Sequence, residues 1–443
     1  MKRFWLVLLS LGLVMAFSAS AFAVDVKFSG SYFAGGMYLD KTSLTKDAST
    51  ATAFYYQKLQ LTTELVVAPG LSLYTRANVM DRIWGATRTA ASTSLDTISA
   101  ATKAENQNIG FDFLYAQFQT PVGMFKVGYQ SNSSWGTIFT NSQTPTGGIT
   151  WWIPVGKALI IPMYFKEGDK SKSNQYTTGI SASDLDNDKY ALAGIYIDKN
   201  IETGLIVVYW RQAANRDLGA SAYLSKYYGV SPYVKATVGP VKIQAEFTYA
   251  FGDLLKLDSG TTGNAYEKLS SLTGWVDATA TFGPVYVGGT FAYSQGQGDD
   301  ANTRNQLLGG GVEWSPALIM WNQDRAYFNG TITSAAVGAA SAFDSSMVNA
   351  FFYQLRAGVK PNDKLNIGAA VSMATADKNP AANWVSKDYG YEIDVTGTYK
   401  ITNNLSYMLG VGYLITGDYF KGTSSANQVT NDYLVINKLT LTF

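Results

Sequence analysis

The fold is decided by a stretch that reads Val241-Lys242-Ile243-Gln244-Ala245-Glu246-Phe247-Thr248-Tyr249-Ala250-Phe251-Gly252. Apolar residues occupy every second position from Val241 to Phe251, and polar or small residues fill the positions between them. Successive side chains of a β-strand point to opposite faces, so this period of two predicts a strand with one apolar face. The same pattern recurs in residues 389–399 and 405–415. Repeated strands of this kind predict an all-β protein.

Short and long connections alternate between the predicted strands. The short ones contain the Gly, Pro or Asn that tight turns need, and they are Pro69-Gly70, Pro121-Val122-Gly123, Asp198-Lys199-Asn200, Gly239-Pro240, Gly283-Pro284, Pro361-Asn362-Asp363 and Thr402-Asn403-Asn404. The long polar ones cover residues 85–107, 168–188, 253–267, 297–304, 329–345, 378–387 and 419–430. This alternation is typical of a transmembrane antiparallel β-barrel with short periplasmic turns and long extracellular loops. We predict such a barrel with about 18 strands, within a range of roughly 16–20.

Two segments fit this pattern less well. Residues 149–165 are interrupted at Gly156 and are interpreted either as two strands or as a loop folded into the lumen. The run from Ala317 to Phe328 alternates only in part and is counted as a weak candidate strand. An 18-stranded cylinder is wide enough for an aqueous lumen unless loops fill it, so the openness of the pore depends on such segments.

The first 23 residues predict export. Lys2 and Arg3 precede an apolar run from Phe4 to Phe17, and Ala21-Phe22-Ala23 is the small-x-small pattern of a signal-peptidase site. The alternative, an uncleaved helical anchor, is disfavoured because the run is shorter than the ~20 residues that span a bilayer. We expect a cleaved signal peptide over residues 1–23 and a single barrel domain over residues 24–443.

Composition excludes several classes of function. Without Lys2 and Arg3, 32 of the 34 basic residues remain against 33 acidic ones, so the mature chain offers no field for nucleic acid. The chain has no Cys and no His, which excludes thiolate metal sites, c-type haem attachment and catalysis through a His base. We therefore expect no enzyme activity, no catalytic residues, no cofactor and no metal.

The faces opposite the apolar ones supply candidate pore-lining residues, because a charge facing lipid is costly. These candidates are Lys58, Glu64, Arg76, Arg82, Asp112, Lys126, Lys242, Glu246, Arg356, Glu392 and Asp394. Both signs are present, so strong ion selectivity is not expected. Arg76 and Arg82, with Lys58 one strand away, form a basic ladder for anions in one interpretation. In the other, they pair with Glu64 and Asp112 and hold the wall together.

The last strand places Tyr433, Val435, Leu439, Leu441 and Phe443 on one face. A barrel must close so that no strand edge stays unpaired in lipid, and we expect this strand to pair with the first one, residues 24–39. A terminal Phe preceded by alternating apolar residues resembles the carboxyl end of bacterial outer-membrane proteins, although Asn437 interrupts the row. The resemblance implies an assembly signal that is recognised by the barrel assembly machinery.

The whole mature chain resembles the porin-type channels of deltaproteobacteria and, more loosely, the alginate-export type of barrel. The likeness rests on residues 24–30 with Tyr32, and on residues 389–394 together with 417–420. It implies a Gram-negative outer-membrane porin for passive diffusion of small hydrophilic solutes or ions. The alternatives are a barrel sleeve for a cytochrome partner in electron export, or a channel specific for sugar acids or polysaccharides. The Pro-Glu-Phe-Gly-Gly motif of classical trimeric porins is missing, so a homo-oligomer and an infolded third loop are left open.

Overall fold

The computed structural model describes residues 24–47, 50–85, 109–170, 185–217, 222–257, 266–334 and 343–443. The predicted signal peptide, residues 1–23, lies outside the described residues and stays a prediction, as does the division into signal peptide and one domain. Most of the predicted long loops 85–107 and 168–188 also lie outside them.

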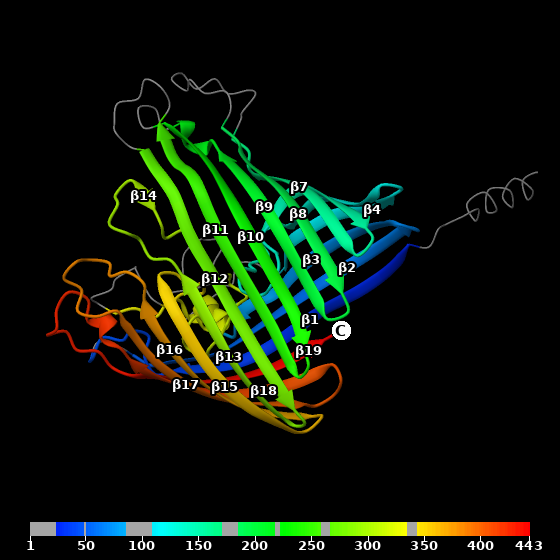
Figure 1. Ribbon diagram of the computed structural model, residues 1–443. Coiled ribbons are helices and arrows are strands. Elements are labelled where there is room, and N and C mark those ends of the chain that lie inside the picture. Colours follow the sequence, from blue (N-terminus) through cyan, green and yellow to red (C-terminus); the bar gives the residue numbers. More distant parts are fainter. Residues whose placement is uncertain are drawn as a thin grey trace, which may run out of the picture.

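The described residues form one antiparallel β-barrel (Figure 1). Its strands are β1 (Asp25–Leu39), β2 (Thr52–Ala68), β3 (Leu71–Ile83), β4 (Ile109–Thr120), β5 (Gly123–Ser131), β6 (Pro145–Val155), β7 (Ala158–Gly168), β8 (Asn187–Asp198), β9 (Ile201–Gln212), β10 (Tyr223–Val238), β11 (Val241–Leu257), β12 (Tyr266–Phe282), β13 (Val285–Ser294), β15 (Ala350–Asn362), β16 (Leu365–Ala376), β17 (Asp388–Lys400), β18 (Leu405–Thr416) and β19 (Asp432–Thr442). A two-residue strand, β14 (Thr303–Arg304), pairs with β12 outside this cycle.

The barrel closes where β1 pairs with β19, and β1 also pairs with β2 on its other side. In the described part of the chain, eighteen strands thus form a continuous cycle, which confirms the predicted antiparallel barrel and its strand number. Closure matters physically because it leaves no unpaired backbone edge toward lipid. The helical elements are short: η1 (Ala214–Asp217), α2 (Gln323–Asn329) and η3 (Asp418–Lys421). None of the described helices is long and apolar enough to cross a membrane.

The short turns lie where the sequence predicts them, at one end of the barrel. One further turn joins β6 to β7 at Gly156, whose φ of 61° suits a residue without a side chain. Residues 149–165 are therefore two strands, and of the two interpretations the first is confirmed.

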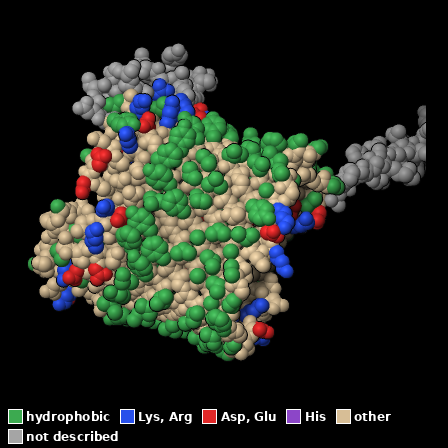
Figure 2. Space-filling model, viewed as in Figure 1, with side chains coloured by type: hydrophobic (Ala, Val, Ile, Leu, Met, Phe, Trp, Pro, Cys, Tyr) green, Lys and Arg blue, Asp and Glu red, His purple; other side chains and the backbone are tan. Residues whose placement is uncertain are grey.

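Outward and inward side chains differ sharply along each strand. On β11, Phe247 is 45% exposed while its neighbour Glu246 is 3% exposed. Figure 2 shows apolar side chains spread over the outer wall across β9–β13, with charged side chains gathered toward its left and right margins. An apolar belt bounded by charged rims is the surface that a transmembrane barrel presents to lipid.

The weak candidate strand Ala317–Phe328 is wrong. These residues do not pair with the barrel wall; they belong to the connection between β13 and β15, which runs inside the barrel and includes α2. Ile319, Met320 and Trp321 are fully buried and pack against inner-wall residues such as Phe352. The apolar residues of this run face a core inside the lumen and not lipid, and this explains the imperfect alternation.

Candidate channel constriction

Two connections fold into the barrel and define the candidate site. Inner loop 1 is residues 132–144, between β5 and β6. Inner loop 2 is residues 305–349, between β14 and β15, of which 305–334 and 343–349 are described. Sequence reasoning left open whether loops enter the lumen, and the structure shows that these two do.

Inner loop 1 is tied to the wall opposite its own strands. Glu246 of β11 accepts a hydrogen bond from the Thr137 N–H at 2.8 Å and another from the Thr137 hydroxyl at 2.5 Å, and it also accepts one from the Thr140 hydroxyl. The indole N–H of Trp275 donates to the Thr137 hydroxyl oxygen at 2.8 Å. Gly136, with φ of 58°, lies where an added Cβ would stand 2.9 Å from the Tyr233 ring. The segment therefore approaches the wall as closely as its backbone allows.

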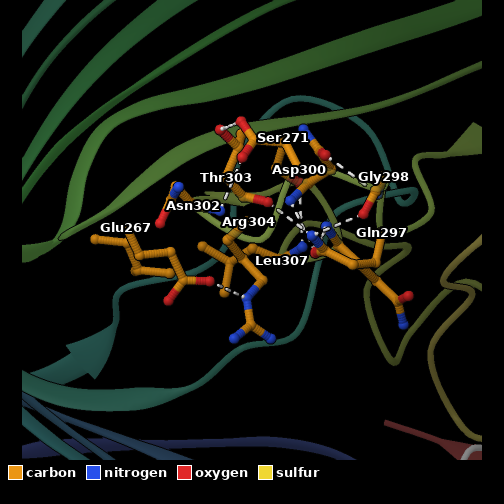
Figure 3. Close-up of polar contacts among 12 residues, drawn as sticks. Glu267, Ser271, Gln297, Gly298, Asp300, Asn302, Thr303, Arg304 and Leu307 are labelled. Carbon is orange, nitrogen blue, oxygen red and sulfur yellow. Dashed lines mark hydrogen bonds and ion pairs between the residues drawn. The ribbon is translucent and has the colours of Figure 1, made fainter. Parts of the chain in front are cut away.

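Inner loop 2 enters the lumen beside β12 (Figure 3). Its approach is fixed first by β14, where Arg304 Nε donates to a carboxylate oxygen of Glu267 at 2.8 Å. In the preceding turn, a hydrogen bond from the Thr303 hydroxyl lowers the pKa of Asp300 below its usual value. The N–H groups of Leu307 and Leu308 then donate to the Ser271 hydroxyl oxygen at 3.2 and 2.9 Å. Ser271 is fully buried on the inner face of β12, so these contacts mark the point of entry.

Two carboxylates of β17 hold the far end of inner loop 2. Glu392 accepts hydrogen bonds from the N–H groups of Ile319 at 2.5 Å and Met320 at 2.7 Å, and Asp394 accepts one from the Leu318 N–H at 3.3 Å. Glu392 is 0% exposed and Asp394 is 5% exposed. Both were predicted to line the pore, and their side chains do point into the barrel. They contact inner loop 2 there instead of open water.

A buried cation stabilises inner loop 2 from within. Arg325 of α2 is fully buried and donates to the carbonyl oxygens of Ile319, Gly330 and Phe343 at 2.8–2.9 Å. The helix is also joined to the wall, because the Tyr327 hydroxyl donates to Asp81 at 2.5 Å.

The two inner loops meet inside the barrel. The Gly311 N–H donates to the Phe139 carbonyl oxygen at 2.5 Å, and the Glu313 N–H donates to the Asn141 carbonyl oxygen at 3.1 Å. A side chain at Gly311 would collide with the backbone of Asn141. Together the described parts of the two loops cross the lumen from β11 to β17.

The remaining candidate residues lie along the inner wall, and most of them are paired. Arg76 binds Asp112 at 2.8 Å and stacks on the Phe113 ring at 3.6 Å. This pair belongs to the second interpretation of the basic residues, whereas Glu64, the other acid in that interpretation, pairs with Lys27. Arg82 is 7% exposed. The other partners are Lys58 with Asp81 at 3.4 Å, Glu64 with Lys27 at 3.5 Å, and Arg356 with Asp277 at 2.7 Å.

Lys242 lies near the turn at Gly239 and is exposed at the rim. At the carboxyl end, the proposed assembly residues of β19 share its outer face: Tyr433 is 37% exposed and Phe443, just beyond the strand, is 49% exposed. Val435, Leu439 and Leu441 lie between them at intermediate exposure. Neither the pore-lining role nor the assembly role follows from these positions alone, and both stay predictions.

A cavity of about 410 Å³ remains beside inner loop 1. Its walls come from β4–β10 and from the loop itself, and they include Tyr115, Lys126, Trp135, Trp152, Phe165, Glu202 and Tyr233. Trp151 and Trp152 separate here: Trp151 stacks on Phe125, and Trp152 lines the cavity. Among the residues that the structure describes, no cluster of three acidic side chains is placed to hold a metal ion.

Sequence reasoning missed the contacts that narrow the lumen. Thr137, Thr140 and Asn141 lie in a loop without periodic patterning, and Arg325 lies in a run that alternates only in part, so no strand rule assigns them a face. The signal that was available is the apolar run at residues 317–321, which is unusual in a connection that would otherwise be exposed to water.

Comparison with known proteins supports the fold. No family model matches the chain, and no curated protein matches it. Among solved structures, Acinetobacter baumannii OccAB1 is similar with a TM-score of 0.53 and 13% identity, covering 96% of this chain and 99% of that one. OccAB3 from the same organism is similar with a TM-score of 0.51 and 11% identity, covering 94% of this chain and 100% of that one. Pseudomonas aeruginosa OccK11 is similar with a TM-score of 0.50 and 11% identity, covering 95% of this chain and 96% of that one. These likenesses confirm that the chain has the fold of an outer-membrane, porin-type β-barrel.

Proposed function

We propose that the protein is an outer-membrane porin, a channel through which small hydrophilic solutes diffuse passively. The observation that carries this proposal is the partial filling of the barrel. Inner loops 1 and 2 occupy one part of the lumen, and a cavity of about 410 Å³ remains along β4–β10 with polar and charged groups in its wall. Such an arrangement suits a narrow passage and not a wide, unselective pore.

The lumen-facing candidates act in this proposal as the wall of the passage. Because Arg76, Lys58 and Arg356 each have a carboxylate within 4 Å, their fields are largely neutralised at short range. We expect weak selectivity between small anions and cations from these pairs. The proposed role is transport without chemistry, so we expect no enzyme activity.

Two alternatives are weighed by the same geometry. A sleeve around a cytochrome needs an empty lumen, whereas here a partner would have to displace inner loop 2 with its buried Trp321 and Arg325. A polysaccharide exporter needs a continuous basic ladder, whereas Arg76 is paired with Asp112. Kinship with deltaproteobacterial channels, recognition of the Phe443 strand by the assembly machinery, and a homo-oligomer belong to the proposal as further expectations.

Single-channel recording in planar bilayers tests the proposal. Folded protein is expected to give a stable open conductance in KCl that is smaller than a clear 18-stranded pore would give. Folding is checked separately by the heat-dependent shift in gel mobility that intact barrels show. Correctly folded protein that never conducts would refute the channel.

A further inference from the structure

The cavity beside inner loop 1 contains a cation without a carboxylate partner. Lys126 of β5 lies in this wall, and its ammonium nitrogen is 4.8 Å from the centre of the Trp152 ring and 5.7 Å from that of Tyr115. Among the described residues, no carboxylate lies within 4 Å of it. By contrast, carboxylates lie that close to Lys58, Arg76, Lys235, Arg356 and Lys438 of the inner wall. Lys189 of β8 has no carboxylate that close either, but its ammonium already donates to the carbonyl oxygen of Asn132.

Aromatic rings hold this ammonium in place without neutralising it. The faces of Trp152 and Tyr115 attract the cation through their quadrupoles, yet they carry no net charge. Trp152 is itself fixed, because its indole N–H donates to the Thr150 hydroxyl oxygen at 3.0 Å. The Thr150 hydroxyl in turn donates to the side-chain oxygen of Gln130 at 3.2 Å. The charge is therefore positioned by a built wall and stays available to a ligand.

The rest of the cavity is mainly apolar. Its lining includes the side chains of Phe113, Trp135, Ile161, Met163, Phe165 and Ile195. The amide of Gln130 already donates to the carbonyl oxygens of Lys126 and Gly148 at 3.1 Å each. Glu202 also lines the cavity, but its carboxylate already forms an ion pair with Lys235 at 3.1 Å and accepts a hydrogen bond from the Tyr233 hydroxyl at 2.9 Å. Among the other polar residues of the lining, the Ser131 and Ser134 hydroxyls bond to each other at 2.7 Å, and the Asn141 side-chain oxygen accepts from the Trp135 N–H at 3.1 Å. Few free polar groups are therefore left to bind a solute rich in hydroxyl groups.

We propose that this cavity is a binding site for small organic monoanions that carry a compact apolar or aromatic body. The anionic group would pair with the Lys126 ammonium, and the body would lie against the aromatic wall beside Trp135. The inference rests on the proposed channel function, because the site would lie on the path of the solute. Its volume is near the lower end of the roughly 300–1,000 Å³ typical of small-molecule sites.

The chemistry excludes other classes of solute. A cation would meet the Lys126 charge in a largely apolar surrounding, where repulsion is screened weakly. A polyhydroxylated anion such as gluconate would lose water from its hydroxyl groups without gaining partners for them, which is unfavourable. Benzoate carries a single negative charge on an aromatic body without hydroxyl groups, so it serves as the probe.

The test measures binding and current separately. Ligand-observed saturation-transfer NMR on the full barrel in detergent reports binding, and block of the KCl current in planar bilayers reports position on the pathway. Benzoate is expected to bind and block, while gluconate does so at least fivefold more weakly and benzyltrimethylammonium does not. Lys126→Met should raise the half-blocking benzoate concentration at least fivefold, and Lys126→Arg should restore it. Lys364→Met, in an exposed periplasmic turn, is the matched control and should leave it unchanged.

The outcomes are distinguishable. Equal block by benzoate and gluconate, or an unchanged response in Lys126→Met with normal heat-dependent mobility, overturns the site and leaves the channel intact. Benzoate binding by a barrel that never conducts overturns the channel function and with it the path on which the site was placed.

Discussion

The carboxylate of Glu246 on β11 accepts two hydrogen bonds from Thr137, one from its N–H at 2.8 Å and one from its hydroxyl at 2.5 Å, across 109 residues of chain. Glu246 is 3% exposed, so these bonds are removed from water. A buried carboxylate requires such partners, since an unsatisfied one is costly. The pair thus determines where inner loop 1 crosses the lumen.

Glu246→Gln is expected to loosen inner loop 1. The amide removes the charge and one acceptor, and each buried hydrogen bond lost costs about 1–3 kcal/mol. We expect a larger mean conductance with more frequent flickering, measured in single-channel records. Glu267→Gln is the control, because it removes a carboxylate that pairs with Arg304 near the rim and does not touch inner loop 1. A quiet channel of unchanged conductance in Glu246→Gln would show that the loop is held by other contacts.

Asp112→Asn is expected to shift ion selectivity toward anions. Asp112 binds Arg76 at 2.8 Å, and neutralising it leaves the Arg76 charge uncompensated in the lumen wall. The reversal potential in a KCl gradient measures the shift. The double variant Arg76→Met with Asp112→Asn should return selectivity toward that of the parent, because both charges of the pair are then absent. Identical reversal potentials in all three proteins would place this pair away from the ion path.

Arg325→Met is expected to unfold inner loop 2 while the barrel stays closed. The substitution leaves the carbonyl oxygens of Ile319, Gly330 and Phe343 without their donor, at a local cost of about 3 kcal/mol or more. Limited proteolysis should then cut within residues 316–334, whereas the barrel keeps its heat-dependent mobility. Lys364→Met, which alters an exposed turn away from inner loop 2, should remain resistant. Equal resistance of both variants would contradict this account of the loop.

The wall of the barrel was predictable because it follows local rules. Val241–Phe251 alternates in sequence and in the structure, and turns such as Gly239-Pro240 occur where their backbone conformations require. Alternation works because lipid faces one side of every strand over its whole length. Both faces can therefore be assigned from the sequence. Glu246 and Glu392 lie on the inner one, while their pore-lining role stays a prediction.

The filling of the barrel was not predictable in the same way. Nothing near Glu246 in sequence indicates Thr137, and nothing near Glu392 indicates Met320, because these contacts join segments 109 and 72 residues apart. The run at 317–321 is apolar like a lipid-facing strand, since an internal core and a membrane both favour apolar side chains. Only the three-dimensional path of the chain separates the two.

Two glycines of the wall give a matched pair for testing barrel assembly. A Cβ on Gly358, on the inner face of β15, would stand 2.6 Å from the Ile367 carbonyl oxygen and would collide with the Tyr286 ring that covers it. A Cβ on Gly397 of β17 meets nothing within 4 Å, and Val395, two residues away on the same face, is 53% exposed on the lipid-facing side.

Gly358→Leu is therefore expected to force Tyr286 off the wall and to lower the folding yield. Overpacking of this kind typically costs about 1–3 kcal/mol. Gly397→Leu adds apolar surface to the membrane belt and should fold as well as the parent. The fraction with heat-dependent mobility after refolding measures both, and equal yields would mean that Tyr286 has another rotamer available at no cost.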